Sequence, residues 1–90
     1  MSRPLFIPLK AEYYQAFLYA TKSTEYRLFG PRWNLKVCAV GRRVRLSYGY
    51  GKSRPRLHGE IVRVRRIRNT LTSIYPKGAW LCAMTIRLDG

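Results

Sequence analysis

Only one segment of this 90-residue chain has the apolar spacing of an amphipathic α-helix, and this restricts the fold class. Within residues 10–21, the i, i+3, i+4, i+7 positions are Tyr14, Phe17, Leu18 and Thr21. The pattern predicts a helix of about three turns that buries this stripe in the core. The remaining segments alternate or are interrupted by glycine and proline, so the helix has to pack against strands.

Five segments are predicted strands: residues 5–9, 24–29, 43–48, 60–65 and 80–88. The fourth can extend to residue 68 if a bulge at Arg65-Arg66 shifts its phase. Residues 49–59 (GYGKSRPRLHG) and 69–79 contain glycine and proline and are predicted loops. A strand, a helix and then several strands predict a single α+β domain over residues 1–90. We expect a small barrel or strongly curled sheet of about five to six mostly antiparallel strands.

The charge balance points to an anionic partner. The chain has 18 lysines and arginines against 4 acids, a net charge of +14, and most of the basic residues are arginine. Self-repulsion of this size is relieved by binding a polyanion, whereas a merely solubilising surface rarely requires so much charge of one sign. A membrane surface is disfavoured, because the predicted helix does not combine a basic face with an apolar one.

The basic residues gather on one predicted hairpin. Val44, Leu46, Val62 and Val64 form the apolar faces of its strands, and Arg43, Arg45, Arg63 and Arg65 form the other faces. Like charges facing each other across strands cost up to about 1 kcal/mol per pair, so this face favours an anion. The loop between the strands adds Lys52, Arg54 and Arg56, interleaved with Tyr48 and Tyr50.

Basic residues beside aromatic rings are typical of single-strand binding, where cations follow the backbone and rings stack on bases. Tyr50, between two glycines, is expected to be exposed, whereas Tyr48 fits core packing and base stacking equally well. The predicted helix precedes the basic region and carries few charges, so it is a poor recognition helix for the major groove. RNA or another single-stranded nucleic acid is therefore the predicted partner.

Neither a metal site nor a cofactor is predicted. Cys38 and Cys82 lie far apart without a CxxC motif, and His58 is the one histidine, so the cysteines are expected to be reduced core thiols. Pro8 and Lys10 interrupt the apolar run that begins at Leu5, which leaves no signal-peptide or membrane-spanning stretch. We expect a cytoplasmic protein.

The segment Ala20-Thr21-Lys22-Ser23-Thr24-Glu25-Tyr26-Arg27 resembles the Gly-x-Lys-ϕ-x-Glu-x-Arg type segment of the ASCH domain, a member of the PUA-like superfamily. Val40-Gly41-Arg42-Arg43-Val44 resembles the turn into a strand found further along in that family. Ala20 stands where the family has glycine. The resemblance implies a PUA-like β-barrel with a cleft beside the helix end that receives RNA or a modified nucleobase.

Some members of that family are nucleases, and others hydrolyse acylated cytidine with a lysine, a threonine three residues later and a distant glutamate. Lys22 matches the lysine, but Glu25 occupies the threonine position, Thr24 is one place off, and Glu60 is the mid-chain candidate for the distant acid. In a binding site, Lys22 and Arg27 would contact phosphate and Glu25 would accept from a base or transfer a proton. Lys22 and Glu25 can equally be a surface ion pair worth under about 1 kcal/mol.

Three functions follow from these patterns. The leading hypothesis is a non-catalytic RNA-binding module. The second is an enzyme, either a metal-independent ribonuclease or a nucleoside amidohydrolase, with Lys22 and Glu25 as catalytic residues. The third is a basic phage- or plasmid-type protein that binds an acidic host protein. The sequence leaves the identity of the RNA and the oligomeric state open.

Overall fold

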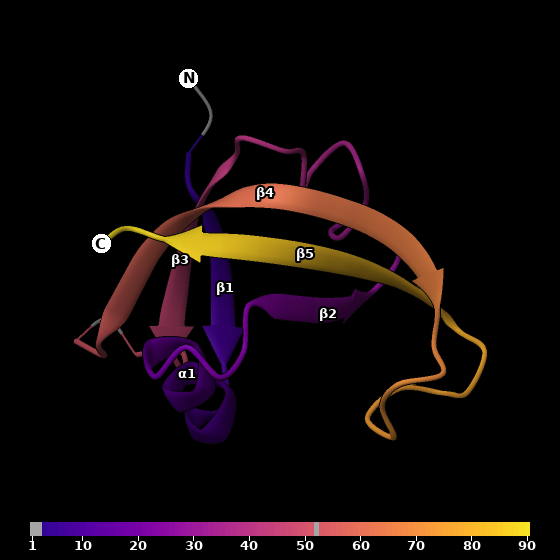
Figure 1. The fold of residues 1–90 in the computed structure, drawn as a ribbon, viewed down its shortest axis with the longest axis horizontal. Helices are drawn as coiled ribbons and strands as arrows, with labels where there is room; N and C mark the ends of the chain where they lie inside the picture. Colours follow the sequence, from indigo (N-terminus) through magenta and orange to yellow (C-terminus); the bar gives the residue numbers. More distant parts are fainter. Residues whose placement is uncertain (1–2, 52) are drawn as a thin grey trace.

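The sheet of this protein is curled into a half-barrel, with its helix packed at one end (Figure 1). The computed structural model describes residues 3–51 and 53–90. Its elements are β1 (Leu5–Leu9), α1 (Ala11–Leu18), β2 (Thr24–Leu28), β3 (Arg43–Tyr48), β4 (Arg56–Arg68) and β5 (Trp80–Leu88). The strand order is β1-β3-β4-β5-β2, with β1 and β3 parallel and the other pairs antiparallel. The predicted α+β class and mostly antiparallel sheet are therefore confirmed.

The long strands β4 and β5 form the arch of the half-barrel and run side by side in Figure 1. Strand β5 is paired on both sides, with β4 and with β2, and four of its successive residues are buried: Leu81, Cys82, Ala83 and Met84. Continuous burial of this kind marks a central strand, whereas the exposed edges of the sheet are β1 and β2.

The apolar core lies inside the curl, between the sheet and α1. It consists of Ile7, Leu9, Tyr14, Phe17, Cys38, Val44, Leu46, Ile61, Cys82, Met84 and Ile86. The half-buried Tyr48 packs its ring edge-on against Tyr14, with centroids 5.4 Å apart, so core packing is the observed environment of Tyr48. Cys38 comes from the segment between β2 and β3, which is tied to β4 by hydrogen bonds from Gly41 N to Ile61 O and from Ile61 N to Arg42 O.

The helix is shorter than the predicted 10–21 segment. It ends at Leu18, because the chain turns at Ala20, which adopts the left-handed φ of 60°. The amides of Thr21 and Lys22 both donate to the carbonyl of Ala16, which closes the helix end. Only part of the predicted stripe is therefore in the core. Tyr14 and Phe17 are buried, whereas the expectation for Leu18 and Thr21 was wrong, since both are exposed.

The predicted loop over residues 49–59 was too long. Strand β4 already begins at Arg56, which pairs with Ser47, so the turn is confined to residues 49–55. Gly59 suggested a loop but lies inside the strand, where a Cβ would come within 2.5 Å of the Arg87 carbonyl oxygen. Glycine is needed here for the close approach of two backbones.

The bulge in β4 lies earlier than predicted. The register shifts between Ile61 and Arg63, not at residues 65–66, and this leaves Val62 outside the core with 38% of its surface exposed. The expectation that Val62 shares the apolar face with Val64 was therefore wrong. Ile61 takes that place because an extra residue in a bulge reverses the alternation of the strand.

The arginines of the predicted hairpin do not face one another across it. Residues 43 and 45 of β3 pair with Glu60 and His58 of β4, whereas residues 63 and 65 of β4 pair with Thr85 and Ala83 of β5. The predicted opposition of like charges was wrong, because β3 pairs only with residues 56–60 of β4, and residues 63 and 65 lie beyond the start of β3. The register still places all four arginines on the outer, convex face of the sheet.

Within residues 3–51 and 53–90, no helix has the length and apolar character needed to cross a bilayer.

Candidate functional site

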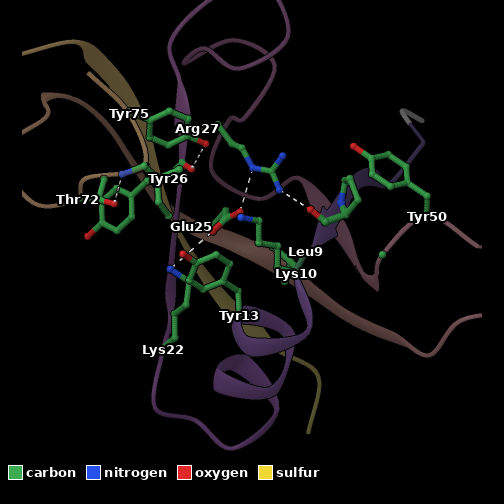
Figure 2. Close-up of a pocket in the computed structure, with 13 residues that line it drawn as sticks. Leu9, Lys10, Tyr13, Lys22, Glu25, Tyr26, Arg27, Tyr50, Thr72 and Tyr75 are labelled. Carbon is green, nitrogen blue, oxygen red and sulfur yellow. Dashed lines mark hydrogen bonds and ion pairs between the residues drawn. The ribbon is translucent and has the colours of Figure 1, made fainter. Parts of the chain in front are cut away.

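A pocket of about 580 Å³ opens at the seam where the two edge strands β1 and β2 approach each other (Figure 2). Its walls come from the end of β1, the middle of β2, the first turn of α1, the turn after β3 and the loop between β4 and β5. The lining residues are Pro8, Leu9, Lys10, Tyr13, Lys22, Glu25, Tyr26, Arg27, Gly49, Tyr50, Thr72, Ile74 and Tyr75. The predicted residues Lys22, Glu25, Arg27 and Tyr50 are thus brought together in one pocket.

Glu25 lies at the centre of this pocket, between Lys22 and Arg27 (Figure 2). It pairs with Met84 of β5, and paired residues point to the same face, so its carboxylate is directed towards the inside of the curl. Only 7% of its surface is exposed. A buried carboxylate needs cationic or hydrogen-bonding partners, and two cations supply them here.

Lys22 follows the turn that ends α1 and approaches Glu25 from the helix side. Its Nζ lies 3.6 Å from Glu25 Oε1, and its side chain is 21% exposed, so this is a partly buried ion pair and not a solvated one. The same Nζ lies 5.3 to 5.7 Å from the ring centroids of Tyr13, Phe17 and Tyr26. Aromatic faces stabilise a cation at this distance and hold the ammonium group in place.

Arg27 uses different edges of its guanidinium for different partners. Its Nε donates to Glu25 Oε2 at 2.9 Å, and its Nη2 donates to the Pro8 carbonyl oxygen at 2.6 Å. Its guanidinium carbon lies 4.8 Å from the centroid of the Trp33 ring. These contacts fix the orientation of Arg27 and, through it, the position of the Glu25 carboxylate.

Tyrosines form the aromatic walls of the pocket. Figure 2 shows Tyr26 and Tyr75 on one side, Tyr13 below Glu25 and Tyr50 on the opposite side. The Tyr75 hydroxyl donates to the Tyr26 carbonyl oxygen at 3.2 Å. Burial raises the pKa of Tyr75 above its usual value, and the positive charge of the nearby Arg27 offsets part of this rise. Tyr50 is 81% exposed, which confirms its predicted exposure and leaves its ring available for stacking.

Sequence reasoning missed the walls supplied by Tyr13, Tyr26 and the loop carrying Thr72 and Tyr75. Tyr13 and Tyr26 are next to Tyr14 and Glu25, which the sequence patterns identified. The spacing of aromatic residues along the chain does not indicate that they line a pocket. The loop 69–79 is held by Asn69, which is buried and bonded to the carbonyls of three loop residues. A buried asparagine organising a loop has no distinctive signature in a single sequence.

The other predicted basic residues lie outside the pocket. Arg56 donates to Ser47 Oγ and to the Gly51 carbonyl oxygen, and Arg54 lies 5.8 Å from the Tyr48 ring, so both brace the turn after β3. Lys52 lies outside the described residues. Arg43 is paired with Asp89. Among the predicted arginines, the exposed Arg45, Arg63 and Arg65 have no side-chain hydrogen bond or ion pair within residues 3–51 and 53–90.

The part of the chain that the structure describes contains no group of three or more histidines, cysteines or acids that could hold a metal. Cys38 and Cys82 are both fully buried, and the interaction between the two thiols lowers the pKa of Cys38 to about 7 and raises that of Cys82. Glu60 lies on the outer face beside Arg87 and is not among the residues that line the pocket.

A scan against protein-family models found no match to this chain, and a search of curated proteins found none either.

Proposed function

We propose that this protein binds single-stranded RNA and receives one base in the pocket beside Glu25. The observation that carries the proposal is a buried carboxylate at the centre of a tyrosine-walled pocket, in a chain with a net charge of +14. An acid enclosed in this way is unfavourable for a purely electrostatic phosphate site. It is suited to accept hydrogen bonds from the donor edge of a base.

The pocket provides the two contacts that base recognition requires. Tyr50 and the half-buried tyrosines of the opposite wall present ring faces, and stacking on aromatic rings is the usual way of holding an unpaired base. Glu25 receives Lys22 on one oxygen and Arg27 on the other, but a carboxylate has about four acceptor positions, so capacity remains for a base. The two cations keep the carboxylate oriented.

The surrounding charge supports binding of the backbone. The exposed Arg45, Arg63 and Arg65 share the outer face of the sheet, and none of them has an acidic partner among the described residues. Their guanidinium groups can contact phosphates without first breaking an ion pair. The eight-residue α1 carries Glu12 in its first turn and no basic residue in its last, which disfavours reading of a major groove.

The resemblance to the ASCH domain points in the same direction. Its PUA-like members use a cleft near the helix end for RNA, and the curled sheet with one helix is compatible with a small barrel of that kind. The residue at the family's glycine position, Ala20, adopts the left-handed backbone that glycine favours, with a φ of 60°.

A binding titration of single-stranded RNA, duplex RNA and duplex DNA at two salt concentrations tests the proposal. We expect single-stranded RNA to bind most tightly, and its logarithmic affinity to fall with the logarithm of salt by about 0.7 per phosphate contacted. A salt-independent affinity would contradict the electrostatic part, and a preference for duplex DNA would contradict the single-strand part.

The variant Glu25→Gln tests the pocket itself, with Glu12→Gln as its matched control. Both substitutions remove one negative charge, but Glu12 is exposed on α1 and does not line the pocket. Removing an acid should strengthen non-specific binding, so Glu12→Gln is expected to bind as well as wild type or slightly better. Glu25→Gln is expected to bind about tenfold more weakly, because the base loses a charged acceptor. Equal affinities for the two variants would place the base elsewhere.

A second function, an RNA-processing enzyme, is favoured by one observation: Lys22 and Glu25 form a partly buried pair in the same pocket. The amidohydrolase version lacks its distant acid there, since Glu60 does not line the pocket. Incubation with labelled RNA and with acylated cytidine distinguishes the two functions. Cleavage that disappears in both Lys22→Ala and Glu25→Ala would establish the enzyme, and cleavage unchanged in both would come from a contaminant or another site.

A further inference from the structure

A second cluster of arginines and aromatic rings lies where β4 ends and β5 begins, on the right in Figure 1. Arg66 pairs with Cys82 and Arg68 with Trp80, so both arginines share the face of the sheet that carries Cys82 and the core. Their guanidinium carbons lie 4.0 and 3.9 Å from the centroid of the Trp80 ring. Arg66 also lies 5.2 Å from the Phe29 ring. We call Phe29, Arg66, Arg68 and Trp80 the Trp80 stack.

The packing of the stack prepares two arginines for an anion. A guanidinium that lies against an aromatic ring uses its face, and its N–H donors remain at its edge. Arg68 donates one hydrogen bond, from Nη1 to the Gly78 carbonyl oxygen at 2.9 Å. Both arginines are exposed, and within the described residues neither has an acidic partner. Their rotamers are restrained before a ligand arrives, which lowers the entropy lost on binding.

The four acidic residues of the chain lie elsewhere, so the positive charges of Arg66 and Arg68 at this end of the sheet are not neutralised by a carboxylate. Glu25 is in the pocket, Glu60 is paired with Arg87, Asp89 is paired with Arg43, and the remaining acid, Glu12, is on α1. Two guanidinium groups against one indole therefore repel each other with no protein carboxylate nearby. An anionic ligand with two or more charged groups removes this repulsion.

The stack is linked to the pocket through one row of the sheet. Arg27 of β2, Cys82 of β5 and Arg66 of β4 are register partners in adjacent strands. Two strand spacings separate Arg27 from Arg66 by about 10 Å. Since Arg27 also contacts Glu25 in the pocket, the two cationic regions lie on the same face of the sheet, on either side of the buried Cys82.

We propose that the Trp80 stack binds the phosphodiester backbone of a single RNA strand, next to the nucleotide whose base lies in the pocket. This inference rests on the proposed function, because it assigns a second contact region to the same ligand. Arg66 and Arg68 each bind a phosphate oxygen through the free edge of the guanidinium, and Trp80 positions them.

The test uses a short single-stranded oligouridine and uridine monophosphate as probes. The variant with both Arg66→Gln and Arg68→Gln is compared with a variant carrying Arg63→Gln and Arg65→Gln. The two double variants lose the same charge from the same strand, but residues 63 and 65 lie on the outer face, away from Trp80. Fluorescence is followed in a Trp33→Phe background, which leaves Trp80 as the reporter.

Because Arg63 and Arg65 are themselves expected to contact phosphates on the outer face, their variant should also bind oligouridine more weakly, and Trp80 fluorescence separates the two variants. We expect oligouridine to change the fluorescence of Trp80 in the Trp33→Phe protein and in the residue 63 and 65 variant, but not in the residue 66 and 68 variant. The residue 66 and 68 variant should bind oligouridine about tenfold more weakly, with a salt slope lower by about 1.4 for two lost phosphate contacts. Its affinity for uridine monophosphate, which reaches only the pocket, should be unchanged.

Unchanged oligouridine affinity and salt slope in the residue 66 and 68 variant would overturn the inference and leave the pocket proposal standing. Failure of the pocket proposal would be recognised separately: a Glu25→Gln variant with normal uridine monophosphate binding would contradict the pocket alone. Wild-type protein that binds neither probe would contradict both.

Discussion

Arg27 of β2 donates a hydrogen bond of 2.6 Å from its Nη2 to the carbonyl oxygen of Pro8 in β1, across the two edges of the sheet. The edge strands β1 and β2 are not paired with each other, so one side chain replaces the ladder that would close a full barrel. The same guanidinium holds Glu25, and the seam and the centre of the pocket therefore depend on one residue.

Arg27→Lys is expected to destabilise the protein by about 1–3 kcal/mol, because lysine keeps the charge but cannot contact Pro8 and Glu25 together with a planar fork. Urea denaturation measures the loss. Arg63→Lys is the control, since Arg63 is exposed without a partner among the described residues, and its effect should stay within about 0.5 kcal/mol. Equal stabilities for the two variants would mean that Arg27 does not hold the seam.

Ala20→Gly is expected to stabilise the protein by about 1 kcal/mol. Ala20 ends the helix with a φ of 60°, a conformation that costs a residue with a Cβ roughly 1–2 kcal/mol and costs glycine almost nothing. Thermal unfolding followed by circular dichroism measures the change. The same substitution inside α1, Ala16→Gly, should destabilise by roughly 0.5–1 kcal/mol. A loss of stability in Ala20→Gly would contradict the left-handed turn.

Gly59→Ala is expected to destabilise the protein by about 1–3 kcal/mol, since its Cβ would lie 2.5 Å from the Arg87 carbonyl oxygen, a backbone atom that cannot rotate away. Gly30→Ala serves as the comparison, because a Cβ there has no neighbour within 4 Å and the backbone needs no positive φ. Denaturant midpoints of the two variants decide the matter. Similar midpoints would show that β4 and β5 are further apart at this point.

The ion pair between Arg43 and Asp89 should make stability depend on pH in the acid range. The hydrogen bond from Arg43 lowers the pKa of Asp89 below its usual value, which raises the stability of the folded state when Asp89 is ionised. This contribution is complete above the unfolded pKa of about 4 and disappears as pH falls through the lower folded pKa. The melting temperatures of wild type and Asp89→Asn should therefore differ at neutral pH and converge in acid. A constant difference would exclude this pair as the cause.

Arg63→Ala is expected to lower the salt slope of single-stranded RNA binding by about 0.7 without changing base preference, because a phosphate contact carries no sequence information. Arg87→Ala is the matched control. Arg87 is also exposed on the outer face but is paired with Glu60, so its loss should change the slope less. Filter binding at several salt concentrations gives both slopes, and an unchanged slope for Arg63→Ala would remove this residue from the backbone contacts.

Most of the strands were predicted correctly, because the alternation of apolar and polar residues that marks a strand spans only a few neighbouring residues. The strand at residues 5–9, the strand at residues 43–48 and the strand at residues 80–88 were predicted with their observed bounds. The errors in strand bounds and register occurred where the local structure depends on pairing with a strand that is distant in the sequence. Gly59 was placed in a loop because residues 49–59 contain three glycines and a proline, a composition typical of turns, but its role is to let β5 approach β4. The bulge at Val62 likewise follows from the pairing with β5.

The α+β class, the excess of positive charge and the proximity of Lys22, Glu25 and Arg27 could be predicted from the sequence, since all three depend on composition or on neighbours along the chain. Three further features required the folded arrangement: Glu25 is buried, Tyr50 joins it in one pocket, and Arg66 and Arg68 lie against Trp80. These relationships join residues from separate elements. They depend on strand order, register and a one-residue bulge, and small changes in any of these would direct the same side chains to the opposite face.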